Sequence, residues 1–174
     1  MRIRLQMLNA VPSALWTAAC LTPVYLFCAH LVPPSLTACF AVCGTVAMVL
    51  PRATLARFAL SRTRATYESL RVHLVIRVTQ DANWLRHLAR APEPRVRRDQ
   101  EALRNIIRDT WTRERFHVGL FLFCILCSTV ALLQLQMAWF LALMLINTVY
   151  NVYPMWLQQY LRLRITRCQT RLPR

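Results

Sequence analysis

Two membrane-length apolar segments lie close together in the second half of the chain, and they constrain its fold more than any other feature. Residues 118–133 and 137–153 are almost wholly apolar, and only the uncharged residues 134–136 separate them. A lipid-spanning helix satisfies its backbone hydrogen bonds internally and needs about 20 residues to cross the hydrocarbon core. We therefore predict a helical hairpin whose two polar ends lie side by side at one membrane face.

Charged residues are segregated from the apolar segments. The chain has 174 residues, 56% of them hydrophobic, with 22 basic residues, all Arg, against seven acidic ones. Residues 5–51 and 118–161 carry no charge, and all seven acids fall between residues 68 and 114. This pattern is typical of a small integral membrane protein, and membrane topology explains the Arg residues better than nucleic acid does. We predict one all-α membrane domain with no nucleic-acid partner.

The hydropathy pattern predicts four transmembrane helices arranged as two hairpins. We expect these crossings at about 11–32, 35–51, 117–134 and 137–156, with a basic amphipathic segment at 52–116 and a basic tail at 157–174. The second crossing is short, about 24 Å at 1.5 Å per residue, so it either extends towards Phe58 or requires a locally thinner bilayer. Because Arg residues cluster on the cytoplasmic side, both termini and the central segment are expected in the cytoplasm.

The central segment shows a helical apolar stripe, which favours a helix lying on the membrane surface or on the bundle. Its members recur at spacings of three, four and seven: Tyr67, Leu70, Leu74, Val78, Leu85 and Leu88. A further helix is expected to start near Asp99, whose carboxylate can cap free amides. Its inward face is expected to carry Leu103, Ile107, Thr110, Glu114 and His117.

Two groups of polar residues are candidates for chemistry. Glu114 and His117 are three residues apart and so share a helix face, where a carboxylate can orient an imidazole that acts as a general base. Asn147, Asn151 and Gln158 share a face of the last apolar helix, with a bend expected at Pro154. The structural alternatives are a polar helix end meeting water and hydrogen bonds between membrane helices.

The seven Cys residues do not indicate a disulfide framework, because six of them lie inside apolar segments. Cys124 and Cys127 have the spacing of a redox or metal pair, but a lipid-spanning helix does not favour the thiolate. We therefore predict a packing role for this pair, with a thiol oxidoreductase as a lesser alternative. The sequence predicts no metal site and no nucleotide-binding loop.

A run of polar residues brackets the predicted hairpin in a fixed order: Thr110, Glu114, His117, Asn151, Pro154, Gln158, Tyr160, Arg162 and Arg164. Over residues 108–165 this order resembles the glycosyl-4,4'-diaponeurosporenoate acyltransferase family, small bacterial membrane proteins of C30 carotenoid synthesis. That family has a Glu-Thr pair and Glu-x-x-His-Trp before a hairpin that ends in Asn-x-Pro and Gln-Arg-Tyr-Asn-Arg-x-Arg. This chain departs from the pattern at Asp109, Val118, Gln159 and Leu161, and has one extra residue between Asn151 and Pro154.

The resemblance implies an enzyme of the bacterial inner membrane that esterifies a sugar hydroxyl of a carotenoid glycoside with a fatty acyl chain. On that basis His117 is the expected general base and Glu114 its orienting partner. Asn151 or Gln158 is expected to donate to the oxyanion, and Arg162 and Arg164 to hold anionic parts of an acyl-CoA or other activated donor. Thr110 and Tyr160 complete the expected substrate site, with no bound cofactor. The alternative is a non-enzymatic four-helix scaffold whose Arg-rich segment binds anionic lipid or a partner protein.

Overall fold

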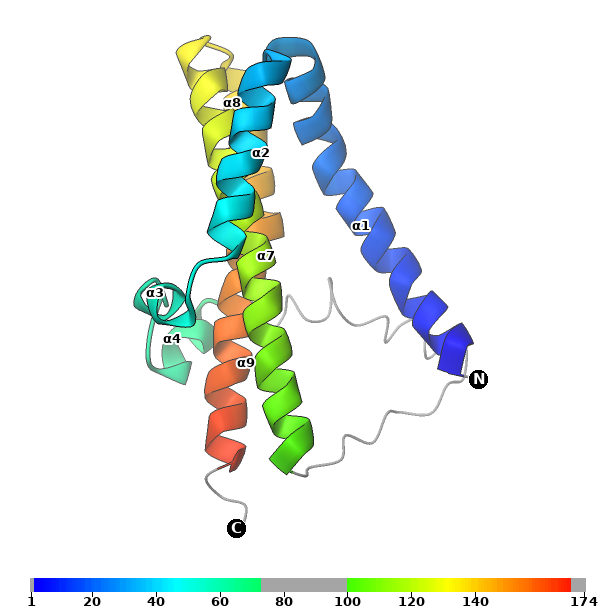
Figure 1. Cartoon of the computed structure of the whole chain (residues 1–174), viewed down its shortest axis with the longest axis vertical. Coiled ribbons are helices and arrows are strands. Elements are labelled where there is room, and N and C mark those ends of the chain that lie inside the picture. The colour runs from blue at the N-terminus through cyan, green and yellow to red at the C-terminus, as the bar shows by residue number, and fades with distance from the viewer. Residues whose placement is uncertain (1, 73–99, 170–174) are drawn as a thin grey trace.

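A computed structural model describes residues 2–72 and 100–169 of the chain, and every regular element in those ranges is a helix. The elements in chain order are α1 (Arg2–Leu31), α2 (Pro34–Met48), α3 (Arg52–Arg57), α4 (Arg64–Ser69), α7 (Gln100–Leu133), α8 (Met137–Asn147), the π-helix η2 (Thr148–Val152) and α9 (Tyr153–Gln169). The long helices stand side by side as a bundle, with α1 leaning away from the others towards its N-terminus (Figure 1). The all-α prediction therefore holds for the described residues.

The turn at 134–136 ends α7 and starts α8, as its sequence predicts. Leu135 adopts the left-handed conformation, with φ 58°. The Gln136 amide donates to the Ala131 carbonyl at 2.8 Å, and the Leu135 amide donates to the Leu132 carbonyl at 3.0 Å. The 6→1 bond and the left-handed residue are those of a Schellman cap, which satisfies the last carbonyls of α7 without a glycine.

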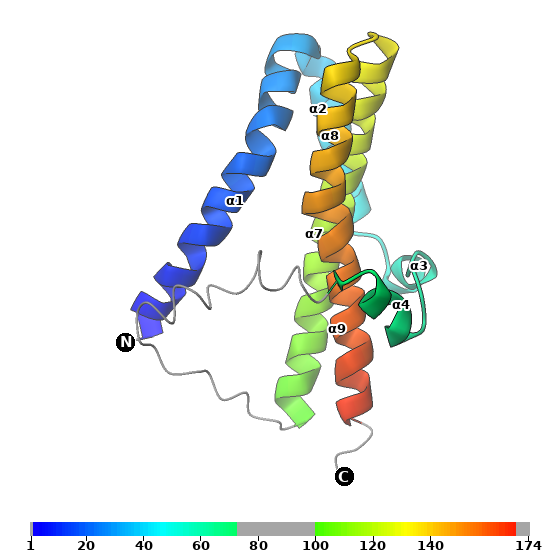
Figure 2. The same ribbon diagram turned by 180° about the vertical axis from the view of Figure 1, so that it is seen from behind.

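The two uncharged turns lie together at one end of the bundle. The side-chain amide of Gln134 donates to the Leu31 carbonyl at 3.0 Å, which joins the α7–α8 turn to the α1–α2 turn. The start of α7 and the end of α9 lie at the opposite end (Figure 2). Three stretches of described helix are long and apolar enough to cross a membrane: Ala14–Leu31, Leu103–Leu133 and Met137–Arg167. The shorter α2 is also apolar, and a fourth crossing through it remains a prediction.

Helices α2 and α7 approach each other closely through the two glycines of the chain. A Cβ atom added to Gly44 would lie 2.9 Å from the Gly119 carbonyl oxygen. A Cβ atom added to Gly119 would lie 2.6 Å from the Gly44 carbonyl oxygen and 2.4 Å from Cγ of Met48. Small residues at membrane-helix crossings permit this backbone contact, so the crossing has no room for any side chain at either position.

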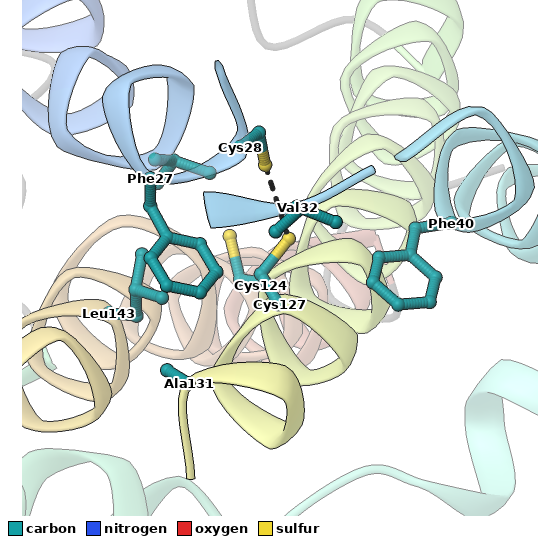
Figure 3. Close-up of a cluster of buried hydrophobic side chains, with 9 residues drawn as sticks. Phe27, Cys28, Val32, Phe40, Cys124, Cys127, Ala131 and Leu143 are labelled. Carbon is teal, nitrogen blue, oxygen red and sulfur yellow. Dashed lines mark hydrogen bonds between the residues drawn. The ribbon is translucent and has the colours of Figure 1, made fainter. Parts of the chain in front are cut away.

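The apolar core lies near the end of the bundle that carries the two turns. It gathers side chains from α1, α2, α7 and α8 around the sulfur atoms of three cysteines (Figure 3). The Sγ atoms of Cys28 and Cys127 are 3.5 Å apart, and both residues are buried with Cys124. Cys124 and Cys127 therefore pack in the core, which agrees with the structural interpretation of their spacing.

One alternative and one expectation for the central segment do not hold within the described residues. The second apolar helix does not extend towards Phe58, because α2 ends at Met48 and Pro51 starts a separate short helix, α3. The apolar stripe does not begin one continuous helix at Tyr67, because α4 ends at Ser69 and Arg71 has the left-handed φ of 52°. The later members of the stripe, Leu74 to Leu88, lie outside the described residues.

Candidate functional site

The candidate site residues come together along the interface between α7 and the η2–α9 segment. From α7 the interface takes Thr110, Glu114 and His117, which recur at spacings of four and three and so share one face. Thr110 and Glu114 are 3% and 1% exposed, and His117 is half-buried. The opposite side of the interface is formed by buried residues from the end of α8, from η2 and from α9: Asn147, Asn151, Gln158, Gln159 and Tyr160. The inward face expected for α7 is therefore observed, and the face shared by Asn147, Asn151 and Gln158 is buried.

The π-helix η2 precedes Pro154 and carries the residues that face His117. Proline has no N–H, so it cannot bond the carbonyl of Tyr150 four residues earlier, and its ring clashes with that carbonyl in a regular α-helix. A wider turn removes the clash, and here the Tyr153 amide donates to the Thr148 carbonyl, five residues back. The bend predicted at Pro154 is thus a π-helix, a feature that is frequent at functional sites.

His117 is oriented by a chain of amides. Its Nδ1 lies 3.4 Å from Oδ1 of Asn151, a long contact. Nδ2 of Asn151 donates to Oδ1 of Asn147 at 2.8 Å, and Nδ2 of Asn147 donates to the Phe121 carbonyl at 3.3 Å. Because each amide nitrogen is already donating, Asn151 presents its oxygen to the ring. In the neutral tautomer that donates from Nδ1 to this oxygen, Nε2 is the basic nitrogen.

Glu114 does not contact His117, and this corrects the expected pairing. Its Oε1 accepts a hydrogen bond from Nε2 of Gln159 at 2.7 Å, and its Oε2 forms an ion pair with Arg162. The Arg162 guanidinium lies over the Trp111 ring, 3.7 Å from its centroid, and its side chain is 12% exposed. The long side chains on α9 reach Glu114, whereas the shorter Asn151 faces His117. Arg162 is thus neutralised by Glu114 and stacked on an aromatic ring.

Gln159 connects Glu114 to the segment between α3 and α4. Its Oε1 accepts from the Leu60 amide at 3.2 Å and lies 3.0 Å from the Tyr67 hydroxyl. That hydroxyl is also 2.9 Å from the Ser61 carbonyl, to which it can donate instead. Burial raises the pKa of Tyr67, so the phenol stays protonated and remains a donor. One buried polar network therefore joins α4, α7 and α9.

The remaining predicted site residues differ in their surroundings. The Thr110 hydroxyl donates to the Ile107 carbonyl of its own helix at 2.6 Å. The Tyr160 hydroxyl lies 3.4 Å from Glu68 Oε1, which also accepts from Arg64 at 2.5 Å. Arg164 is exposed and lies apart from the buried network. Gln158 is 1% exposed, and its Nε2 has no hydrogen-bond partner among the described residues.

Sequence reasoning missed Gln159, Tyr67 and Trp111 as members of the buried network. Gln159 appeared only as a departure from the family pattern, and Tyr67 as part of an apolar stripe. A usable signal was present: Gln158 and Gln159 are adjacent polar residues inside an uncharged apolar helix, where each buried amide needs a partner. Asn147 was found from its spacing, but its role as the residue that orients Asn151 was not.

The site has the groups that general base catalysis needs and no evident metal centre. Among residues 2–72 and 100–169 no three His, Cys, Asp or Glu side chains form a possible metal site. The imidazole of His117 is half-buried, and Nε2 of Gln158 is buried without a hydrogen-bond partner among the described residues. A general base and a hydrogen-bond donor for the oxyanion are the two groups that acyl transfer to a hydroxyl group requires.

Comparison with known proteins identifies one family. A family model described as glycosyl-4,4'-diaponeurosporenoate acyltransferase matches residues 51–171. The matched range contains α7, α8, η2 and α9 and therefore the whole candidate site. No curated protein and no solved structure matches the chain.

Proposed function

Because the chain belongs to the glycosyl-4,4'-diaponeurosporenoate acyltransferase family, we propose that it transfers a fatty acyl group to a sugar hydroxyl of a glycosylated C30 carotenoid carboxylate. The membrane-length apolar helices support lipid-like substrates that enter from the bilayer. The observation that carries the proposal is His117, whose Nδ1 contacts Asn151 inside the matched range.

In the proposed reaction, Nε2 of His117 removes the proton from the sugar hydroxyl. The hydroxyl oxygen attacks the carbonyl carbon of the acyl donor, an acyl-CoA or another activated acyl compound, and the carbonyl becomes a tetrahedral oxyanion. When the intermediate collapses, the bond to the leaving group breaks and the imidazolium returns its proton to that group. A positioned base of this kind contributes about 100- to 10,000-fold in rate.

The buried contacts change the roles of four neighbouring residues in this proposal. Asn151 orients the His117 ring through its oxygen, and its nitrogen is already bonded to Asn147. Gln158 is therefore the better oxyanion donor, because its Nε2 has no partner among the described residues. Glu114 and Arg162 hold α7 and α9 together beside the reacting groups and take no part in proton transfer.

The test is acyl transfer by the full chain in membranes that contain a glycosylated C30 carotenoid carboxylate and acyl-CoA. We expect mass spectrometry to detect the acyl ester with the wild-type protein. His117→Ala is expected to lower the rate about 100- to 10,000-fold. His30→Ala is the matched control, because His30 is exposed on α1 at the other end of the bundle, and it should leave the rate unchanged.

Two results would count against the proposal. One is no ester of any chain length from well-expressed wild-type protein, which would favour the non-enzymatic scaffold. The other is an equal rate in the His117→Ala and wild-type proteins, which would remove the imidazole from the reaction while leaving the family assignment intact.

A further inference from the structure

An open pocket with a basic lining lies beside the first turns of α7 and the start of α3. Its volume is about 630 Å³, and its lining residues are Arg52, Glu101, Arg104, Asn105, Ile107 and Arg108. Ligand pockets in proteins are typically about 300–1,000 Å³, so this one has room for a small charged group. Among the described residues, three guanidinium groups against one carboxylate give the lining a net positive charge.

The position of the pocket follows from the end of α2. Arg108 and Gly119 are eleven residues apart on α7, which is about three helical turns and about 16 Å, so they lie on the same face. Helix α2 covers that face at Gly119 and ends at Met48. Beyond this end α2 no longer covers the face of α7. Arg52, the first residue of α3, lines the pocket there.

The guanidinium groups of the pocket are not used in ion pairs within the described part of the chain. Arg104 donates to the Gln100 carbonyl at 3.3 Å, and Arg108 bonds to the Asn105 side chain, so both of these partners are neutral. The ion pairs in the same ranges are Arg64–Glu68 and Arg162–Glu114, which lie elsewhere. The pocket thus has positive charge available for an anion, in contrast to the neutralised Arg162.

We propose that this pocket binds a phosphate-bearing group at the membrane surface. Guanidinium groups bind phosphate through paired, charge-assisted hydrogen bonds. Helix α2 and its C-terminal cap residue expose Val42, Val46 and Val49, so an acyl chain attached to the phosphate would find apolar surface on the helix that precedes α3. The proposal concerns binding and does not depend on the acyl-transfer reaction, so either one can fail while the other holds.

Two sources can supply such a group, and binding to the purified full chain separates them. Native mass spectrometry measures retention of phosphatidylglycerol against phosphatidylcholine, and calorimetry measures binding of coenzyme A and of inorganic phosphate. The test variant is Arg52→Gln/Arg108→Gln. The matched control is Arg57→Gln/Arg113→Gln, which also removes one exposed Arg from α3 and one from α7, at positions outside the pocket.

We expect saturable binding of phosphatidylglycerol or coenzyme A by the wild-type protein, and a loss of about tenfold in affinity in the pocket variant relative to the control pair. Binding of the lipid would identify a headgroup, and binding of coenzyme A would identify a soluble donor. An equal loss in both double variants would show general surface attraction and overturn the proposal, as would no saturable binding of any probe. If the double variant does not fold, Arg52→Gln compared with Arg57→Gln decides the question.

Discussion

Gln159 shows at the scale of single residues why this chain departs from the pattern it resembles. Its carbonyl accepts from the Leu60 amide and faces the Tyr67 hydroxyl, while its nitrogen donates to Glu114. An Arg, which the resembled pattern has at this position, only donates hydrogen bonds. It would leave the Leu60 amide without its acceptor, so the surroundings of position 159 in this chain require an amide.

The first stability prediction follows from this donor and acceptor arrangement. Gln159→Glu keeps both acceptor contacts but places a second carboxylate 2.7 Å from Glu114. We expect the free energy of unfolding in mixed detergent micelles to fall by about 3 kcal/mol, because like charges in contact cost several kcal/mol. The exchange variant Glu114→Gln/Gln159→Glu restores one donor and one acceptor and should recover part of the loss.

The control for this prediction is Gln136→Glu, which makes the same chemical change at an exposed position in the α7–α8 turn. It should change the free energy of unfolding by no more than about 0.5 kcal/mol. A Gln159→Glu protein as stable as wild type would show that Glu114 and Gln159 are not in contact.

At the scale of helices, the π-helix before Pro154 sets which residues of the last membrane helix face α7. Replacing Pro154 restores a backbone N–H and allows regular α turns through η2. One residue more or less in a helical turn rotates the flanking residues by about 100° relative to each other. Asn147 and Gln158 flank that turn, so they cannot both face α7 once it is regular, and Asn151 inside it changes direction as well.

We therefore expect Pro154→Ala to lower the acyl-transfer rate about 100-fold through misplacement of Asn151, without lowering the thermal stability. The rate assay and a melting curve of the same preparation measure the two effects. Pro34→Ala is the control, because Pro34 is the first residue of α2, a position where proline and alanine are both tolerated. A fully active Pro154→Ala protein would show that the π-helix does not position the site.

Sequence alone predicts the faces of these helices better than their partners. Period and charge place Thr110 and Glu114 on the inward face of α7, where the structure has them. Spacing does not reveal that the partners of Glu114 are Gln159 and Arg162, which lie more than forty residues later in the chain, and that His117 is not one of them. That outcome depends on side-chain length and on the π turn, which shifts the register of α9 relative to α7.

At the scale of the molecule, the charge pattern separates the two ends of the bundle, and the structure brings the two uncharged turns together through Gln134 and Leu31. The sequence did not predict that α2 and α7 cross at Gly44 and Gly119. Both glycines lie in apolar segments, a signal for close helix packing that was available. Their pairing depends on the relative height of two helices, which no local pattern specifies.

The predicted orientation is tested by labelling intact cells with a membrane-impermeant maleimide, in a Cys168→Ser background. Leu135→Cys lies in the exposed α7–α8 turn and Thr166→Cys in the exposed part of α9. Because Arg-rich segments stay in the cytoplasm, we expect labelling of Leu135→Cys from outside and of Thr166→Cys only after the cells are permeabilised. The reverse result would invert the topology and place the candidate site outside.

The contact between Gly44 and Gly119 has a consequence for ligand entry. The neighbours of both glycines carry side chains (Cys43, Thr45, Val118 and Leu120), so α2 fits against α7 at a single height. A slip of one residue would move the end of α2 by about 1.5 Å, and with it the start of α3, where Arg52 lines the basic pocket. The two residues of the chain that have no side chain thus fix how far Arg52 stands from the pocket residues on α7.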